Sequence, residues 1–166
     1  MIPVPAAILA APSQATPAPS QGPLRAQYAW GYVGADGEGK GTLNLLVDAA
    51  TGEVVVELMG IGERLMLLKG DAAAGYRLQI PRQKVDETAR ELRDLPLPFL
   101  PSLGGPAALR DLAVAGKGPG VKVTRRDASG PVKLRYQGKD DAGKDVFVWL
   151  ERKAWMPVAA APPAAR

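Results

Sequence analysis

The stretch Glu53-Val-Val-Val-Glu-Leu-Met-Gly-Ile-Gly-Glu-Arg-Leu-Met-Leu-Leu-Lys69 decides the fold that we expect for this chain. Its two apolar runs, Val54 to Met59 and Leu65 to Leu68, consist mostly of residues that favour strands or pack in them, and Gly-Ile-Gly separates the runs. Two such runs joined by a short glycine-containing link predict a β-hairpin. A turn normally projects polar side chains into water. The large apolar residue at this tip is therefore unusual.

Alternation of apolar and polar residues predicts further strands on both sides of this hairpin. The segments Leu24 to Val33 and Lys40 to Asp48 alternate before it, and Tyr76 to Ile80 alternates after it. Short links that contain Gly or Asp join these five segments, which favours an antiparallel meander. The last third of the chain returns to the same rhythm. Its expected strands are Val121 to Asp127, Val132 to Tyr136 and Asp145 to Arg152.

The pattern changes after Pro81, where two short helices are expected. The first runs from Val85 to Arg93, because Val85, Ala89 and Leu92 recur at helical spacing and the charges suit the helix dipole. The second covers about residues 107–115 and ends at the glycine-rich segment that follows. Between them, Leu95 to Pro106 is apolar but interrupted by prolines, so we expect an irregular apolar cover there.

These elements predict one α+β, mainly β domain over residues 24–155. The architecture that suits them is a curved, unclosed antiparallel half-barrel, with the short-helix and proline-rich insert covering its concave face. Residues 1–23 hold six prolines and no charged side chain, so we expect a disordered Pro/Ala/Ser linker. Removal of an export signal or a natively disordered N-terminus would explain this linker equally well. Residues 156–166 are expected to be a disordered tail.

The composition excludes several kinds of chemistry. The 166 residues include no cysteine and no histidine, which removes disulfides, thiolate nucleophiles, histidine acid–base catalysis and most zinc or iron sites. The chain has 21 basic and 17 acidic residues with their signs interleaved, so no clustered basic arm offers itself to nucleic acid. We expect no enzyme, no cofactor, no metal and no nucleic-acid partner. The acidic pairs Asp86/Glu87 and Asp140/Asp141 are interpreted as capping and turn residues.

The order of features from Leu24 to Trp155 resembles the bacterial lipoprotein-localisation factors, the periplasmic carrier LolA and, more closely, the outer-membrane receptor LolB. The segment Leu58-Met-Gly-Ile-Gly-Glu-Arg-Leu65 is similar to the receptor's protruding loop with an apolar tip. Leu95-Pro-Leu-Pro98 and Leu109-Arg-Asp-Leu112 are similar to the proline motif and the second helix of that family. The chain departs from the pattern in three ways. Its tip reads Gly-Ile-Gly where Pro-Leu-Gly is usual, Leu112 stands where the receptor often has Trp, and the lipidated N-terminal cysteine is absent.

The resemblance implies a protein that binds the acyl chains of lipoproteins, or other apolar ligands, in a concave cavity and helps deliver them to the outer membrane. The implied partners are these lipids, a LolA-like carrier and the membrane surface. The implied location is the periplasmic side of the bacterial outer membrane, for a lipoprotein whose N-terminal signal and cysteine are missing from this chain. The residues expected to line the cavity are Leu43, Leu45, Val54, Val56, Leu58, Leu65, Leu67, Phe147 and Trp149.

A membrane- or acyl-contact loop is expected at Met59, Gly60, Ile61 and Gly62. In this hypothesis Ile61 dips into a bilayer surface or guides an acyl chain; the alternatives are a turn folded back on its own core, or one buried against a partner protein. Each expected cavity residue would equally suit ordinary core packing. The alternative function is a non-enzymatic scaffold or protein-interaction module of the cell envelope, with the same fold but no lipid ligand.

Overall fold

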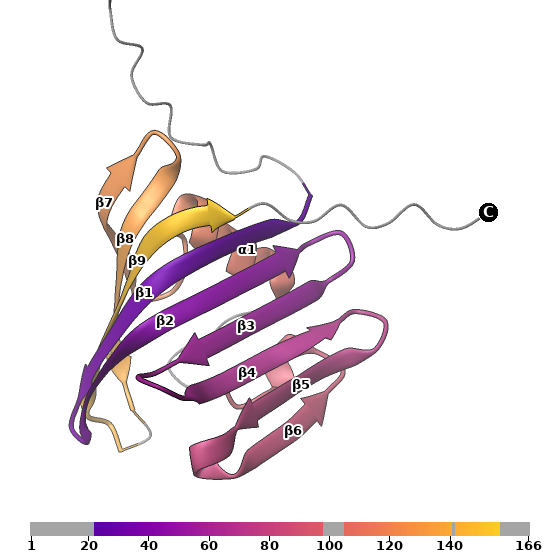
Figure 1. Ribbon diagram of the computed structural model, residues 1–166, viewed down its shortest axis with the longest axis horizontal. Helices are drawn as coiled ribbons and strands as arrows, with labels where there is room; N and C mark the ends of the chain where they lie inside the picture. The colour runs from indigo at the N-terminus through magenta and orange to yellow at the C-terminus, as the bar shows by residue number, and fades with distance from the viewer. Residues whose placement is uncertain (1–21, 98–104, 141, 157–166) are drawn as a thin grey trace, which may run out of the picture.

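The computed structural model describes residues 22–97, 105–140 and 142–156, which form one antiparallel sheet with one α-helix (Figure 1). The helix is α1 (Pro106–Ala115), and two short 3₁₀ turns are η1 (Pro81–Gln83) and η2 (Leu92–Asp94). The strands are β1 (Leu24–Gly34), β2 (Gly37–Asp48), β3 (Glu53–Met59), β4 (Arg64–Asp71), β5 (Gly75–Ile80), β6 (Val85–Ala89), β7 (Val121–Asp127), β8 (Gly130–Lys139) and β9 (Asp145–Met156).

The nine strands follow the order β6-β5-β4-β3-β2-β1-β9-β8-β7 across the sheet. Strands β1 to β6 form a meander, and β9 pairs with the free side of β1 and carries β8 and β7 beyond it. The edge strands β6 and β7 are not hydrogen-bonded to each other, so the sheet remains open. This confirms the prediction of a mainly β protein built on an unclosed antiparallel sheet.

The strand register determines which side chains share a face of the sheet. Cross-strand partners project to the same side, whereas successive residues of a strand project to opposite sides. Leu45 lies opposite Val56, and Val47 lies opposite Val54. All four are buried, and we call their side of the sheet the inner face and the other side the outer face. The main core consists of Leu24, Ala26, Tyr28, Leu45, Val47, Val54, Val56, Met66, Leu68, Tyr76, Leu78, Ile80, Leu92, Leu95, Leu109 and Ala113.

Helix α1 packs on the inner face, behind the sheet in the view of Figure 1. Its buried residues are Leu109, Leu112 and Ala113. Gly116 ends the helix in the left-handed conformation with φ of 69°, and its N–H donates to the Leu112 carbonyl at 3.0 Å. A Cβ at this position would lie 2.2 Å from the Val123 side chain, so glycine also allows the helix end to approach β7 closely. The expected second helix is confirmed.

The expected first helix, Val85 to Arg93, is wrong. The structure has strand β6 over Val85–Ala89, followed by the 3₁₀ turn η2 at Leu92–Asp94. The spacing misled because residues four apart share a face of a strand as well as a face of a helix. The proportion of β-favouring residues in this short segment is low, so the sequence pattern gave no second signal.

Pairing with β5 decides the conformation of this segment. The turn η1 reverses the chain, helped by Lys84 in the left-handed conformation with φ of 54°. It brings Val85 opposite Ile80, so that the apolar side of β6 extends the inner face. Arg77 of β5 donates two hydrogen bonds to the Asp86 carboxylate, at 2.8 and 2.6 Å, on the outer face. In the strand conformation, the apolar residues of the segment pack against the core and Asp86 pairs with Arg77.

Parts of three expected segments lie outside the described residues: 1–21 of the linker, 98–104 of the proline-rich cover and 157–166 of the tail. Met156 is the last residue of β9. Among the residues that the structure describes, no helix is both long enough and apolar enough to cross a membrane.

Candidate functional site

An apolar cavity of about 40 Å³ lies between the inner face of the sheet and α1. Its walls are aliphatic side chains, with one tyrosine among them. Pockets that enclose small-molecule ligands measure about 300–1,000 Å³, so the protein's own side chains fill most of this space. The lining residues are Tyr28, Leu43, Leu45, Val56, Met66, Leu68, Leu97, Leu109, Leu112, Ala113, Leu134 and Leu150.

Part of the expected cavity lining lies on the inner face. Leu43, Leu45 and Val56 line the cavity itself. Val54 is fully buried in the core beside it, and Leu58 is partly buried and packs against the same core. The β2–β3 hairpin thus supplies one wall of the cavity.

Among the other expected lining residues, Leu67, Phe147 and Trp149 lie on the outer face, and Leu65 lies in the β-bulge between Arg64 and Met66. None of the four lines this cavity. Leu67 pairs with Glu57, so Met66 and Leu68 take the inner positions of β4. On β9, the inner position belongs to Leu150. Both strands are apolar on two faces, and alternation alone cannot tell which set of residues turns inward.

Sequence reasoning missed most of the remaining lining residues. Met66 and Leu68 were recoverable from the hairpin register, which pairs them with Leu58 and Val56. Leu134 and Leu150 come from β8 and β9, far from the hairpin in sequence, and pair with each other. Their approach to the cavity depends on β9 returning to β1, which no local pattern indicates.

Tyr28 brings the cavity its polar group. Its side chain is 2% exposed, and its buried hydroxyl has no hydrogen-bond partner among the described residues. Burial raises the pKa of this phenol to about 12, against the opposing effect of the nearby Arg152 charge. The hydroxyl therefore remains protonated at neutral pH and can donate a hydrogen bond. A buried unpaired hydroxyl is costly, so the group is poised to gain from a ligand that accepts its hydrogen bond.

Arg152 lies opposite Tyr28 in the β1–β9 register and is itself 7% exposed. Its Nη2 donates to both carboxylate oxygens of Asp127 at 2.9 Å and to the Ser129 hydroxyl at 2.6 Å. The guanidinium also stacks over the Trp155 ring, 4.6 Å from its centroid. Hydrogen bonds from Ser129 and Arg152 lower the pKa of the Asp127 carboxyl to about 2. This network neutralises the buried guanidinium, so we interpret Arg152 as a structural residue that joins β9 to the β7–β8 turn.

The β3–β4 turn presents Ile61 to solvent, with 84% of the residue exposed. The Gly60 N–H donates to the Glu63 carbonyl at 2.9 Å, and Gly62 has φ of +78°, which favours glycine. Glu63 also forms an ion pair with Arg82 of η1. These interactions of Gly60 and Glu63 fix the conformation of the turn. Ile61 at its tip does not fold back on the core.

The remaining charged candidates have structural partners. Arg64, beside the tip, pairs with Glu57 at 2.8 Å across the hairpin. Asp86 pairs with Arg77, and the Asp140 carboxylate accepts hydrogen bonds from the backbone N–H groups of its own turn. Within residues 22–97, 105–140 and 142–156, no group of three or more acidic residues gathers in a way that could hold a metal ion.

The fold and this site define a mainly β protein whose open antiparallel sheet packs its inner face against one helix, with a small apolar cavity between them. Comparison of the sequence with protein-family models gives no match, and comparison with curated proteins gives none.

Tyr28→Phe is expected to stabilise the protein by about 1 kcal/mol, because it removes a buried hydroxyl that lacks a partner while keeping the ring. Tyr76→Phe is the matched control. The Tyr76 hydroxyl is buried and donates to the Gly52 carbonyl at 2.7 Å, so its loss should destabilise by about 1 kcal/mol. Urea unfolding measures both changes. Destabilisation of the same size in the two variants would mean that the Tyr28 hydroxyl has a partner after all.

Proposed function

We propose that this protein is a LolA/LolB-like half-barrel that binds the acyl chains of lipoproteins, or similar apolar ligands, and helps deliver them to the outer membrane. The observation that carries the proposal is the small apolar cavity between the open sheet and its helical cover, lined in part by a phenol that has no partner among the described residues. Acyl chains suit such a cavity because its walls offer aliphatic contact and few fixed polar groups. The periplasmic location and the LolA-like carrier as partner follow from the sequence resemblance.

Binding requires the cover to move, because about 40 Å³ holds no acyl chain. Within the described residues, the cover consists of α1, η2, Leu95 and Leu97. Burying a leucine side chain contributes about 1.5–3 kcal/mol, so uncovering Leu109, Leu112 and their neighbours costs on the order of 5 kcal/mol. Each buried methylene of a ligand returns about 0.8 kcal/mol. Burial of about seven methylenes therefore offsets the free-energy cost of uncovering the cavity. Longer chains have a net favourable free energy of binding.

Tyr28 supplies the polar contact in this proposal. Lipoprotein acyl chains are attached through ester or amide carbonyls, which accept hydrogen bonds. The Tyr28 hydroxyl is protonated, buried and without a partner in the described part of the chain, so it donates to such a carbonyl when the chain enters. The contact would place the carbonyl at the β1 side of the cavity.

Ile61 supplies the membrane contact. The β3–β4 turn is fixed at its base and holds one large apolar side chain in solvent. Desolvation of this side chain in a bilayer surface contributes about 1–2 kcal/mol. Arg64 is engaged with Glu57 beside the tip, so the apolar contact does not depend on that arginine.

One observation favours the alternative, a cell-envelope scaffold or protein-interaction module that binds no lipid. The described side chains already fill most of the space under α1. In that case α1 is a permanent part of the core, and the inner face never opens.

A titration with acyl probes of increasing length separates the two functions. Short chains of about six carbons should not bind, whereas beyond about eight carbons the affinity should rise about fourfold per methylene. Intrinsic tryptophan fluorescence or displacement of an apolar dye measures the binding. A flat titration at every length, with a protein that unfolds cooperatively, would establish the scaffold function instead.

Ile61→Glu should weaken association with phosphatidylcholine vesicles about tenfold or more, because it replaces the exposed apolar tip with a charge. Ala73→Glu, in the exposed β4–β5 turn at the opposite end of β4, introduces the same charge as a control. Sedimentation with vesicles measures the bound fraction after circular dichroism has shown both variants to be folded. Equal binding by the two variants would remove Ile61 from the membrane contact.

A further inference from the structure

The outer face of β7, β8 and β9 gathers positive charge around two aromatic rings. We call the surface formed by Lys122, Arg125, Lys133, Arg135, Phe147 and Trp149 the basic aromatic patch. Five of these residues, all except Lys122, line a shallow open hollow, and the 49%-exposed Val33 lies among them. The other residues that line the hollow are Thr124 and Val148. The four cations fall within residues 122–135, and they come to face one another only when β7 and β8 pair.

Like charges face each other across two strands of this patch. Lys122 of β7 is the direct partner of Arg135 of β8, and Arg125 is the direct partner of Lys133. Like charges in direct cross-strand positions destabilise a sheet. Glu151 relieves one side of the patch, because it contacts Arg125 at 3.2 Å and is the direct cross-strand partner of Lys133. The remaining positive charge is unfavourable for the fold alone and favourable for binding an anion.

The geometry of the two rings indicates which anion fits. The Lys133 ammonium lies 5.8 Å from the Trp149 ring centroid, and the Arg135 guanidinium lies 5.1 Å from that of Phe147. Trp149 also lies against the backbone of Gly31, where a Cβ would come within 2.1 Å of the ring. The ring faces are therefore partly occupied by the protein's own groups. Nucleic-acid bases need open ring faces for stacking, whereas the interface of a bilayer accepts aromatic rings flanked by cations.

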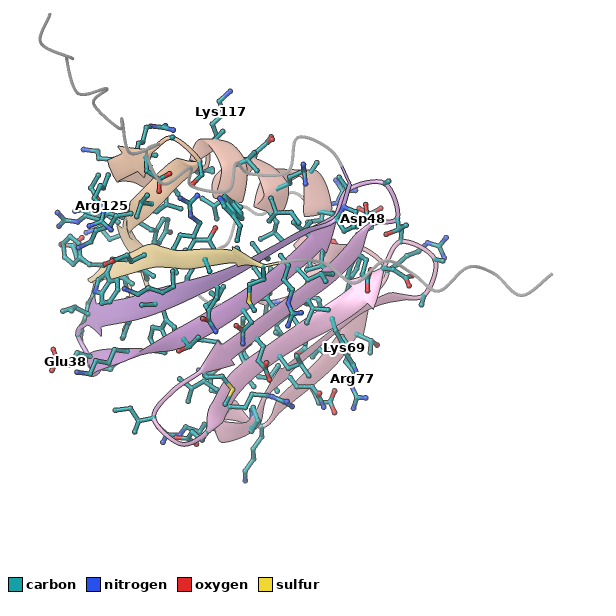
Figure 2. The ribbon with its side chains drawn as sticks, turned by 45° about the horizontal axis from the view of Figure 1, so that its top comes forward. Glu38, Asp48, Lys69, Arg77, Lys117 and Arg125 are labelled. Atoms are coloured by element: carbon teal, nitrogen blue, oxygen red, sulfur yellow. The ribbon has the colours of Figure 1, made fainter. Side chains whose placement is uncertain are left out.

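The patch adjoins the end of the sheet that carries the exposed apolar residues. Strands β1 and β3 run parallel, each antiparallel to β2, so Val33 and the Ile61 turn lie at the same end. Strand β9 begins at this end, with Phe147 opposite Val33. Figure 1 shows the β1–β2, β3–β4 and β8–β9 turns at one end of the sheet, and Figure 2 shows Glu38 there, with Arg125 on the same side of the molecule and Lys69 far from both.

We propose that the basic aromatic patch binds the anionic headgroups of a phospholipid bilayer, beside the apolar tip that enters it. The lipid phosphates neutralise the opposed cations, while Trp149, Phe147 and Val33 settle at the headgroup level. The choice of a membrane as partner rests on the proposed function. The patch adds a preference for anionic lipid, which the tip alone does not confer.

The test compares vesicles of phosphatidylcholine alone with vesicles that also contain phosphatidylglycerol, at low and high salt. The variant Lys133→Gln/Arg135→Gln should lose about 30-fold of the binding to anionic vesicles, since each basic residue near such a surface contributes about fivefold. Its binding to phosphatidylcholine should not change. The control Lys69→Gln/Arg25→Gln removes the same charge at the opposite end of the sheet, near the end of β4 and the start of β1, and should retain the preference. A blue shift of tryptophan emission on anionic vesicles should disappear in Trp149→Phe.

Three results would overturn the proposal: equal losses in the two double variants, equal binding of the wild type to both kinds of vesicle, or binding of a single-stranded oligonucleotide that the patch variant alone abolishes.

Failure of the proposed function would give a different set of results. In that case no acyl probe binds and Ile61→Glu changes nothing, while the patch still distinguishes anionic from neutral vesicles.

Discussion

The structure depends on covering one apolar face of a sheet that does not close. Strands β6 and β7 remain separate edges, so the inner face cannot complete itself as a barrel. Leu24, Leu68 and Leu78 on this face are almost fully buried, which requires material on top of them. In the described chain, that material is α1, η2 and the residues that flank them. A face of this kind must be covered by the protein's own chain or by a ligand.

This constraint connects the fold to the proposed function. The cover is a short helix flanked by glycines, and it contributes only a few large side chains to the core. Its removal costs on the order of 5 kcal/mol, a cost that a long acyl chain can offset but a short one cannot. The same arithmetic explains how a nearly filled cavity of about 40 Å³ can belong to a lipid-binding protein. In the proposed function, the small cavity is the closed state of the site, and the Tyr28 hydroxyl, which has no partner among the described residues, is its hydrogen-bond donor.

Much of the fold could be predicted from the sequence, because alternation along β1, β2, β5 and β8 and the apolar runs of β3, β4 and β9 are local signals. The helix α1 was also predictable, from its apolar side and its terminal glycine. Strand β6 was not, since Val85 and Ala89 have a spacing that fits both a helix and a strand. Its conformation follows from pairing with β5, which is a tertiary effect.

The candidate site was only partly predictable for a related reason. Leu43, Leu45 and Val56 lie in a hairpin where one face is clearly apolar, and they reach the cavity. Phe147 and Trp149 lie on a strand that is apolar on both faces, and the choice between the faces depends on how β9 pairs with β1. The basic aromatic patch was invisible for the same reason, because its opposed cations meet only when β7 and β8 pair.

Hydrogen exchange of α1, with and without a saturating long-chain acyl probe, tests the central claim that the cover gives way to a ligand. An isolated helix shorter than about 12 residues is marginal in water, so a displaced α1 should lose its amide protection. The account predicts fast exchange over Pro106–Ala115 in the complex and retained protection in β2 and β3. Saturable binding with α1 as protected as in the free protein would contradict it.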